Sequence, residues 1–307
     1  MILCCGEALI DMLPRRLPDG SDVYLPVAGG AVFNTAITLG RLGADAGFLS
    51  GLSSDMFGDT LRQSLEESGV DHNLCITSPH PTTLAFVKLV NGNAQYQFYD
   101  EASAGRMIAT SDLPEIPQDV SAMHFGAISL IPEPCGATYE ALALGQANRC
   151  VISLDPNIRR SFIRSEQTYR TRLTRMIAVA DIVKVSDEDL EWLAGDASPE
   201  ETVAGWLNAA TSLVAITRGA DGAHIHTRNG RIDVPARKVE VVDTVGAGDS
   251  FNGGLLHGLC RAGLLGKEAL RGAAPEALRE AVELAVEVAA ITVSRAGANP
   301  PWESELG

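Results

Sequence analysis

Short apolar runs alternate along most of the chain with longer segments in which apolar residues recur every three or four positions. The runs predict buried strands and the longer segments predict helices, a succession typical of a mostly parallel sheet with helices on both faces. We expect strands at 2–10, 47–51, 122–125, 150–154, 181–185, 213–217 and 237–242, and helices at 31–42, 55–68, 250–262 and 275–294. The pattern therefore predicts the α/β class.

Two segments depart from this alternation. Residues 14–27 are polar and contain prolines, and residues 82–100 alternate apolar with polar side chains around Asn91-Gly92. An Asn-Gly pair between alternating segments is a strong signal for a β-hairpin. We predict a small antiparallel lid formed from about 14–28 and 82–106, carried by a single domain over residues 1–307, because the sequence contains no linker and no repeat.

Composition and charge argue against some classes of binding partner. The net charge is −15 and no run of Lys or Arg occurs, which argues against nucleic acid or an anionic membrane as a partner. The six cysteines have no zinc-like spacing, so we expect reduced thiols. The N-terminus lacks a basic region, and no apolar run reaches the roughly 18 residues of a membrane span. These features predict a cytoplasmic protein.

The segment 243–252, DTVGAGDSFN, carries the strongest functional signal. Gly246, Ala247 and Gly248 lie where an extended segment meets a helix, so backbone N–H groups and the helix dipole form an anion site. Asp249 places a carboxylate in the first turn, where it could act on the group that attacks phosphorus. The alternative is a tight turn followed by an ordinary helix start.

Further glycine-rich segments support the phosphate interpretation. Thr217, Gly219 and Gly222 follow a predicted strand and could present amides and a hydroxyl to phosphate, although any turn could have this form. The sequence has neither a P-loop motif nor a dinucleotide fingerprint after a strand. Another glycine pair lies nearer the N-terminus. Here we expect Asp11, Gly29, Gly30 and Asn34 to hold hydroxyl groups, with Asp11 at the end of the first strand.

Three weaker candidates remain open. The segment 155–159, DPNIR, follows a predicted strand and could be a site or simply a turn, and Arg159 and Arg106 could reach an anionic ligand or lie on the surface. His224 and His226 share one side of a probable strand, but a third metal ligand is not nearby in the sequence.

Taken together, these motifs resemble the ribokinase-like (PfkB) carbohydrate kinases, and among them most the fructokinases. The resemblance covers nearly the whole chain and rests on GEALID at 6–11, GGAxxN at 29–34, DPNIR at 155–159, TRGxxG at 217–222, DTVGAGD at 243–249 and SRxGA at 294–298. It implies a ribokinase-like fold and a homodimer formed through the β lid.

The resemblance also implies roles for individual residues. Asp249 would be the catalytic base and the amides of Gly246, Ala247 and Gly248 the anion hole. The sugar would be held by Asp11, Gly29, Gly30, Asn34, Tyr99, Arg106 and Arg159. The nucleotide would lie near Lys184, Ser186, Thr217, Gly219 and Gly222. Potassium or another monovalent cation would bind Asp243 and the carbonyls of Val245, Thr292, Arg295 and Gly297.

One segment departs from the family pattern. Where the family carries Asn-x-x-Glu, this chain has Ser186 and Asp189, so Asp189 would reach Mg²⁺ with a shorter arm, through water. We expect the helix dipole to lower the pKa of Asp249 and leave a weak base.

The expected activity is ATP-dependent phosphorylation of a primary hydroxyl on a ketohexose, with fructose as substrate. The alternatives are 2-keto-3-deoxygluconate, ribose or a nucleoside as substrate, and a sugar-binding regulatory protein without catalysis.

Overall fold

The computed structural model describes residues 1–90 and 93–307, and its frame is a central sheet. Within the described residues this sheet has eight strands in the order β14-β13-β12-β11-β10-β9-β1-β4. The strands from β4 to β12 are parallel, and the pairs at the other edge are antiparallel. Their bounds are β1 (Ile2–Cys5), β4 (Ala46–Leu49), β9 (Ala122–Gly126), β10 (Val151–Asp155), β11 (Ile182–Ser186), β12 (Leu213–Thr217), β13 (Ala223–Thr227) and β14 (Gly230–Val234).

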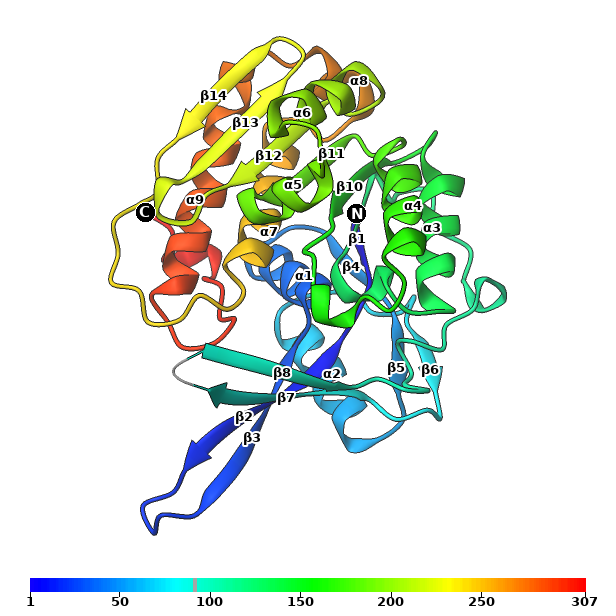
Figure 1. Ribbon diagram of the computed structural model, residues 1–307, viewed down its shortest axis with the longest axis vertical. Coiled ribbons are helices and arrows are strands. Elements are labelled where there is room, and N and C mark those ends of the chain that lie inside the picture. The colour runs from blue at the N-terminus through cyan, green and yellow to red at the C-terminus, as the bar shows by residue number, and fades with distance from the viewer. Residues whose placement is uncertain (91–92) are drawn as a thin grey trace.

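Helices cover both faces of this sheet (Figure 1). Successive side chains of a strand point to opposite faces, so Ile2 and Cys4 join one core while Leu3 and Cys5 join the other. The first core is covered by α1 (Ala31–Arg41), α2 (Met56–Glu67), α7 (Ala247–Arg261), α8 (Lys267–Gly272) and α9 (Arg279–Val293). The second is covered by α3 (Cys135–Gln146), α4 (Glu166–Ile177), α5 (Asp187–Ala194) and α6 (Pro199–Asn208).

A second sheet projects from one end of the central body (Figure 1). Its order is β3-β2-β7-β8, with the bounds β2 (Leu9–Arg16), β3 (Asp22–Gly29), β7 (Thr83–Val90) and β8 (Asn93–Tyr99). Two antiparallel hairpins are joined by parallel pairing of β2 with β7. The predicted hairpin at 82–100 is thus present, while its Asn91-Gly92 turn lies outside the described residues. We refer to this sheet as the lid sheet.

Short elements complete the chain. A pair of strands, β5 (Gly51–Ser53) and β6 (Ile76–Ser78), lies beside the lid sheet. The 3-10 helices are η1 (Thr110–Asp112), η2 (Ala127–Leu130), η3 (Arg160–Phe162), η4 (Gly219–Asp221), η5 (Pro275–Leu278) and η6 (Glu303–Glu305). Of the helices in the described part of the chain, none is long and apolar enough to span a bilayer.

Three predicted strands need correction. The expected strand 2–10 is two strands in different sheets, because the chain turns at Gly6, where a Cβ would lie 2.5 Å from Cγ2 of Val32. The expected strand 47–51 also divides, between β4 and β5. Residues 237–242 form no strand, since Val242 donates its N–H to the carbonyl of Val293 instead of pairing with a sheet.

The close packing of α7 against α9 generates a stability prediction. A Cβ on Gly258 would lie 2.6 Å from Cα of Ala281, so Gly258→Ala should lower the free energy of unfolding by about 1–3 kcal/mol. Gly205 is exposed in α6 with no atom near its Cβ position, so Gly205→Ala should raise that free energy by about 0.5–1 kcal/mol. Urea unfolding of both variants measures the difference; equal effects would contradict this packing.

Candidate active site

The site is centred on Asp249, a buried carboxylate in the first turn of α7. Gly246 ends the preceding loop in the left-handed conformation, with φ 78°, and begins the helix. The side-chain amide of Asn34 donates to one carboxylate oxygen of Asp249 at 2.9 Å, and that of Asn157 donates to the other at 3.4 Å. The carboxylate is therefore held from two sides by amides that come from α1 and from the loop after β10.

The pKa of Asp249 is raised to about 6, and the main cause is burial. The hydrogen bond from Asn34 opposes this shift, the nearby charge of Asp155 adds to it, and the charges of Lys184 and Arg159 oppose it. The expectation of a lowered pKa and a weak base is wrong, because desolvation of the charged form outweighs the helix dipole. Asp249 is a stronger base than an exposed aspartate.

The glycine turn beside Asp249 requires its small residues. A Cβ on Gly246 would lie 2.6 Å from Cβ of Ala298, and one on Gly248 would lie 2.8 Å from Nζ of Lys184. The Lys184 ammonium thus lies against the first turn of α7, and it pairs with Asp155 at 2.9 Å, with both side chains buried. The turn combines helix-terminal amides with a nearby fixed positive charge, an arrangement suited to a phosphoryl group.

Asp11 lies in β2 of the lid sheet. Its predicted position, at the edge of the central sheet, is therefore wrong. A Cβ on Gly29 would lie 2.5 Å from the Asp11 carboxylate, so Asp11 on β2 lies directly against Gly29 at the end of β3. Burial raises the pKa of Asp11 to about 6, and the charge of Asp249 adds to the shift. The two carboxylates therefore share one electrostatic environment, with Gly29 and Gly30 beside them.

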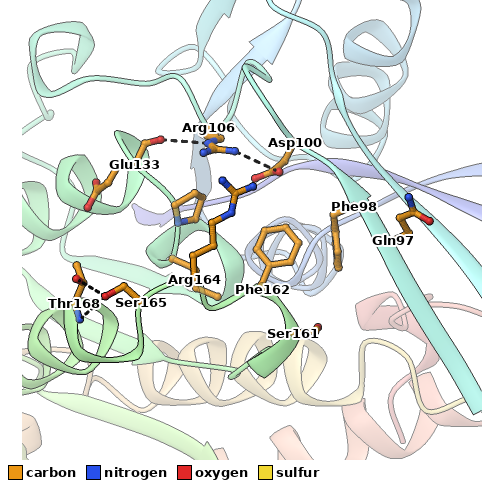
Figure 2. Close-up of a pocket in the computed structure, with 12 residues that line it drawn as sticks. Gln97, Phe98, Asp100, Arg106, Glu133, Ser161, Phe162, Arg164, Ser165 and Thr168 are labelled. Carbon is orange, nitrogen blue, oxygen red and sulfur yellow. Dashed lines mark hydrogen bonds and ion pairs between the residues drawn. The ribbon is translucent and has the colours of Figure 1, made fainter.

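A cavity of about 560 Å³ opens between β8 and the loops that precede α3 and α4 (Figure 2). The rings of Phe98 and Phe162 meet edge to face at one side of it, with centroids 4.4 Å apart. Cross-strand pairing places Phe98 and Asp11 in one row through Ala85, so they lie on one face of the lid sheet. The cavity thus lies on the face of the lid sheet that carries Asp11, and its volume is typical of small-ligand pockets.

Two predicted sugar contacts lie apart from this row. Tyr99 is on the opposite face of β8 from Phe98, is 55% exposed and packs edge to face against Phe86. Arg106 lines the cavity, where it pairs with Asp100 at 3.5 Å and donates to the carbonyl of Glu133 (Figure 2). The structure therefore brings neither residue together with Asp249, whereas Arg159 is close enough for its charge to lower the pKa of Asp249.

The predicted nucleotide residues lie at the carboxyl ends of β11 and β12. Ser186 caps α5 by accepting from the N–H of Asp189, which fixes the first turn of that helix. Gly219 and Gly222 have positive φ values of 51° and 89°, as the turn around η4 requires. Thr217 is half-buried and donates to the carbonyl of Val185 at 3.4 Å.

Asp189 lies among these strand ends. Burial raises its pKa, the charge of Asp155 adds to the shift, and the charge of Lys184 opposes it. One of its carboxylate oxygens accepts the N–H of Ile158 at 3.3 Å.

Asp243 connects two of the segments that are predicted to bind the monovalent cation. Its carboxylate accepts the N–H of Val245 at 3.0 Å and that of Gly297 at 2.9 Å. Thr292 and Arg295 lie at the end of α9, joined by a hydrogen bond from the Arg295 N–H to the Thr292 carbonyl. The Asp243 carboxylate thus connects the segments around Val245 and Gly297, and carboxylate and carbonyl oxygens are the donors that suit a hard cation.

The histidine pair has another environment. His224 and His226 lie on β13, and Nε2 of His224 is 3.2 Å from Arg231 and 3.3 Å from Arg218. In the part of the chain that the structure describes, no three His, Cys, Asp or Glu side chains form a metal-binding group.

Sequence reasoning missed several residues around this site. Asn252 donates to Asp155 at 2.7 Å from the second turn of α7, and Glu7 accepts backbone N–H groups from α1 and η2. Asn252 is three residues after Asp249 and so lies on the same helix face, a spacing that could have identified it. The signal for Glu7 was its acidic side chain within an otherwise apolar segment.

A family model described as "pfkB family carbohydrate kinase" matches residues 2–305. The chain belongs to this family. It is 53% identical over 279 residues to a fructokinase from Rhizobium leguminosarum bv. trifolii, covering 91% of this chain and 86% of the relative. The predicted family and sugar kinase activity are thereby confirmed.

Solved structures agree with this assignment. A fructokinase from Xylella fastidiosa with bound ATP has a TM-score of 0.88 and 31% identity, covering 97% of this chain and 93% of that one. A fructokinase double mutant from Vibrio cholerae O395, in a fructose, ADP and potassium ion bound form, has a TM-score of 0.83 and 27% identity, covering 97% and 93%. The predicted ribokinase-like α/β fold is confirmed.

The raised pKa of Asp249 generates a pH prediction. A carboxylate base must be ionised, so kcat/KM for the sugar should fall as the pH drops through about 6, where half of Asp249 is protonated. Direct chromatographic measurement of ADP in quenched samples between about pH 5 and 8 tests this without coupling enzymes. A kcat/KM that stays level down to about pH 5, as for an aspartate with the ordinary pKa of 3.8, would contradict the effect of burial.

Proposed function

We propose that this chain is an ATP-dependent fructokinase that uses Asp249 as its base. The observation that carries the proposal is the buried Asp249 carboxylate, which two side-chain amides orient beside the amides of Gly246, Ala247 and Gly248. In the proposed step, Asp249 accepts the proton of a primary hydroxyl as its oxygen bonds to the γ-phosphorus, and the bond from that phosphorus to ADP breaks. The helix-terminal amides stabilise the charge on the phosphoryl oxygens.

The sugar is proposed to lie between the lid sheet and α1. Asp11 would accept its hydroxyl groups, Asn34 would donate and accept, and Gly29 and Gly30 allow the backbone to approach closely. Phe98 supplies an apolar wall on the same face as Asp11. A site that hydrogen-bonds hydroxyls discriminates strongly against analogues that lack them, because its own buried polar groups are left without partners.

The pairing of Arg106 with Asp100 favours a neutral sugar over a sugar acid. Asp100 lies 3.5 Å from the guanidinium of Arg106, and their side chains are only 13% and 18% exposed. The positive charge of Arg106 is thus largely compensated by Asp100. Arg159 is the other predicted arginine that could bind the carboxylate of a sugar acid. Two relatives named as fructokinases, 53% and 34% identical to this chain, support fructose as well. Phosphorylation of 2-keto-3-deoxygluconate, ribose or a nucleoside, and sugar binding without catalysis, are the alternatives.

ATP is proposed to bind at the strand ends, with its γ-phosphoryl group at the glycine turn. Thr217, Gly219 and Gly222 would line the nucleotide, with Ser186 holding the adjoining turn. The ammonium of Lys184, next to Gly248, would attract the transferring group. The relative from Xylella fastidiosa was solved with bound ATP, which supports ATP as the nucleotide.

Two kinds of cation are proposed to assist. Mg²⁺ characteristically uses one or two carboxylates together with phosphates and water, and Asp189 supplies a carboxylate at the nucleotide end. A monovalent cation, K⁺ first, would be held by Asp243 and the carbonyls of Val245, Thr292, Arg295 and Gly297, where it would add positive charge behind the glycine turn. The relative from Vibrio cholerae has a potassium ion bound.

The lid sheet supports two further proposals on assembly and location. The face of the sheet opposite Asp11 exposes Tyr24 and Tyr99, which both pack edge to face against Phe86 and form an apolar surface suited to pairing two copies as a homodimer. We also propose a single domain over residues 1–307 that acts in the cytoplasm, with the lid sheet closing over the sugar.

A substrate panel tests the fructose assignment. We expect kcat/KM for fructose to exceed that for ribose and 2-keto-3-deoxygluconate, and Asp249→Asn to lose about 10²–10⁴-fold of turnover while remaining folded. The Asn variant also controls for contaminating kinases, because it keeps the size and fold of the site. Phosphosugar and ADP should be quantified together.

Two results would overturn parts of this assignment. Higher efficiency on 2-keto-3-deoxygluconate, lost in Arg159→Ala, would replace fructose by the acid and leave the kinase assignment standing. Turnover of Asp249→Asn within a few-fold of the wild type would remove Asp249 from the base role.

The cation proposal predicts a dependence on potassium. We expect turnover with saturating ATP and Mg²⁺ to rise when K⁺ replaces tetramethylammonium at equal ionic strength, because the large organic ion cannot enter the carbonyl site. Asp243→Asn should weaken the activation by lowering the charge on one ligand. Equal rates in both salts would count against the site.

A further inference from the structure

Glu7 lies at the junction of the two sheets and has no role in the proposed chemistry. It belongs to the link between β1 of the central sheet and β2 of the lid sheet, and its residue is only 7% exposed. One carboxylate oxygen accepts the N–H groups of Ala31 at 2.9 Å and Val32 at 3.4 Å. The other accepts the N–H of Ser129 at 3.3 Å. One side chain therefore joins the sheet junction to α1 and η2.

These bonds satisfy a helix start that has no other side-chain cap. The residue that caps α1 is Gly30, which carries no side chain and adopts φ 112°. The first amides of a helix lack intrahelical partners, and a carboxylate there also interacts favourably with the helix dipole. Glu7 thus provides from 23 residues away the cap that Ser, Thr or Asp usually provides locally.

The glycine pair lies between Glu7 and Asp11. A Cβ on Gly30 would be 2.9 Å from the Glu7 carbonyl and 3.2 Å from Cγ of Glu7, whereas one on Gly29 would be 2.5 Å from the Asp11 carboxylate. The two acidic residues, four positions apart, therefore pack against adjacent glycines. Any shift of Glu7 would move the surface proposed to hold the sugar.

The same helix carries the contact to the base. Asn34 lies in the first turns of α1 and donates to Asp249 at 2.9 Å. Holding the start of α1 thus also holds Asn34 against Asp249. On the other side, η2 follows directly from β9 and leads to Ile131, which lines the cavity. Glu7 contacts the elements on both sides of the sugar site and none of the nucleotide residues.

Ionisation of Glu7 does not raise the free energy of unfolding at neutral pH, as ionisation of an acid in an ordinary ion pair would. Burial raises its pKa to about 7, although its backbone hydrogen bonds oppose the shift. An acid whose pKa is raised by folding makes the folded state less stable as the pH rises from its unfolded value of 4.5 toward 7. Its location is therefore better explained by the geometry it imposes on the glycine pair.

We infer that Glu7 is a positioning residue for the sugar, whose carboxylate fixes the Gly29–Gly30 turn and η2 relative to the lid strand. The inference rests on the proposed function, because the sugar is placed at that turn. It assigns to Glu7 an effect on sugar binding that is separate from any effect on ATP.

Glu7→Gln tests this inference with a side chain of nearly equal size. The amide keeps one acceptor oxygen and sets an N–H₂ donor against one of the backbone donors, so we expect KM for fructose to rise about tenfold. KM for ATP should stay within about twofold, and the melting temperature should change little. A KM for fructose that stays at the wild-type value, or equal rises for both substrates, would overturn the inference.

Asp181→Asn is the matched control. Asp181 is 3% exposed, accepts the N–H of Ile152 at 2.9 Å and pairs with Lys267, but it lies at the opposite end of β11 from the site. This variant should lower the melting temperature and leave both KM values unchanged. An Asp181→Asn enzyme with the same selective rise in fructose KM would show that loss of any buried carboxylate has this effect, and would overturn the inference.

Failure of the proposed function can be distinguished from failure of this inference. If the wild type phosphorylates another sugar of the panel, the KM values for that sugar and for ATP are compared between the wild type and Glu7→Gln. If it phosphorylates none, hydrogen–deuterium exchange of Glu7→Gln decides. Faster exchange at the amides of Ala31, Val32 and Ser129, with α9 unchanged, supports the positioning role; unchanged exchange there contradicts it.

Discussion

Desolvation of acidic side chains is the constraint on which the rest of this site depends. Asp249, Asp11 and Glu7 all have raised pKa values, to about 6, 6 and 7, and burial is the main cause for each. A buried carboxylate is stable only when hydrogen-bond donors surround it. The amides of Asn34 and Asn157 meet that need for Asp249 and also orient its carboxylate, the proposed base.

The lid sheet follows from the same constraint. β1 and β2 belong to different sheets, yet the short link between them places Glu7 and Asp11 on the two sides of the Gly29–Gly30 turn. Neither acid could approach so closely if those positions carried a Cβ. The proposed sugar site and the attachment of the lid sheet thus use one piece of backbone, which is why the proposed effect of Glu7 is confined to the sugar.

Much of the fold could be predicted because local pattern and tertiary structure agree. The parallel strands from 122 to 217 and helix α1 lie close to their predicted positions, and the DTVGAGD segment identified the helix start that carries Asp249. The split after Cys5 could not be predicted, because it depends on packing of Gly6 against Val32. The predicted direction of the Asp249 pKa shift was wrong for a similar reason. The helix dipole is a local effect, whereas the burial of Asp249 comes from segments distant in the sequence.

We propose above all that Asp249 accepts a hydrogen bond from the reacting hydroxyl of fructose. A crystal structure with fructose and a non-hydrolysable ATP analogue tests it most directly. We expect the primary hydroxyl oxygen at hydrogen-bond distance from the Asp249 carboxylate, with other hydroxyls on Asp11 and Asn34. Arg164 lines the cavity beside Arg106 (Figure 2). Fructose seated against these two arginines, with its primary hydroxyl groups away from Asp249, would contradict the proposed role of Asp249.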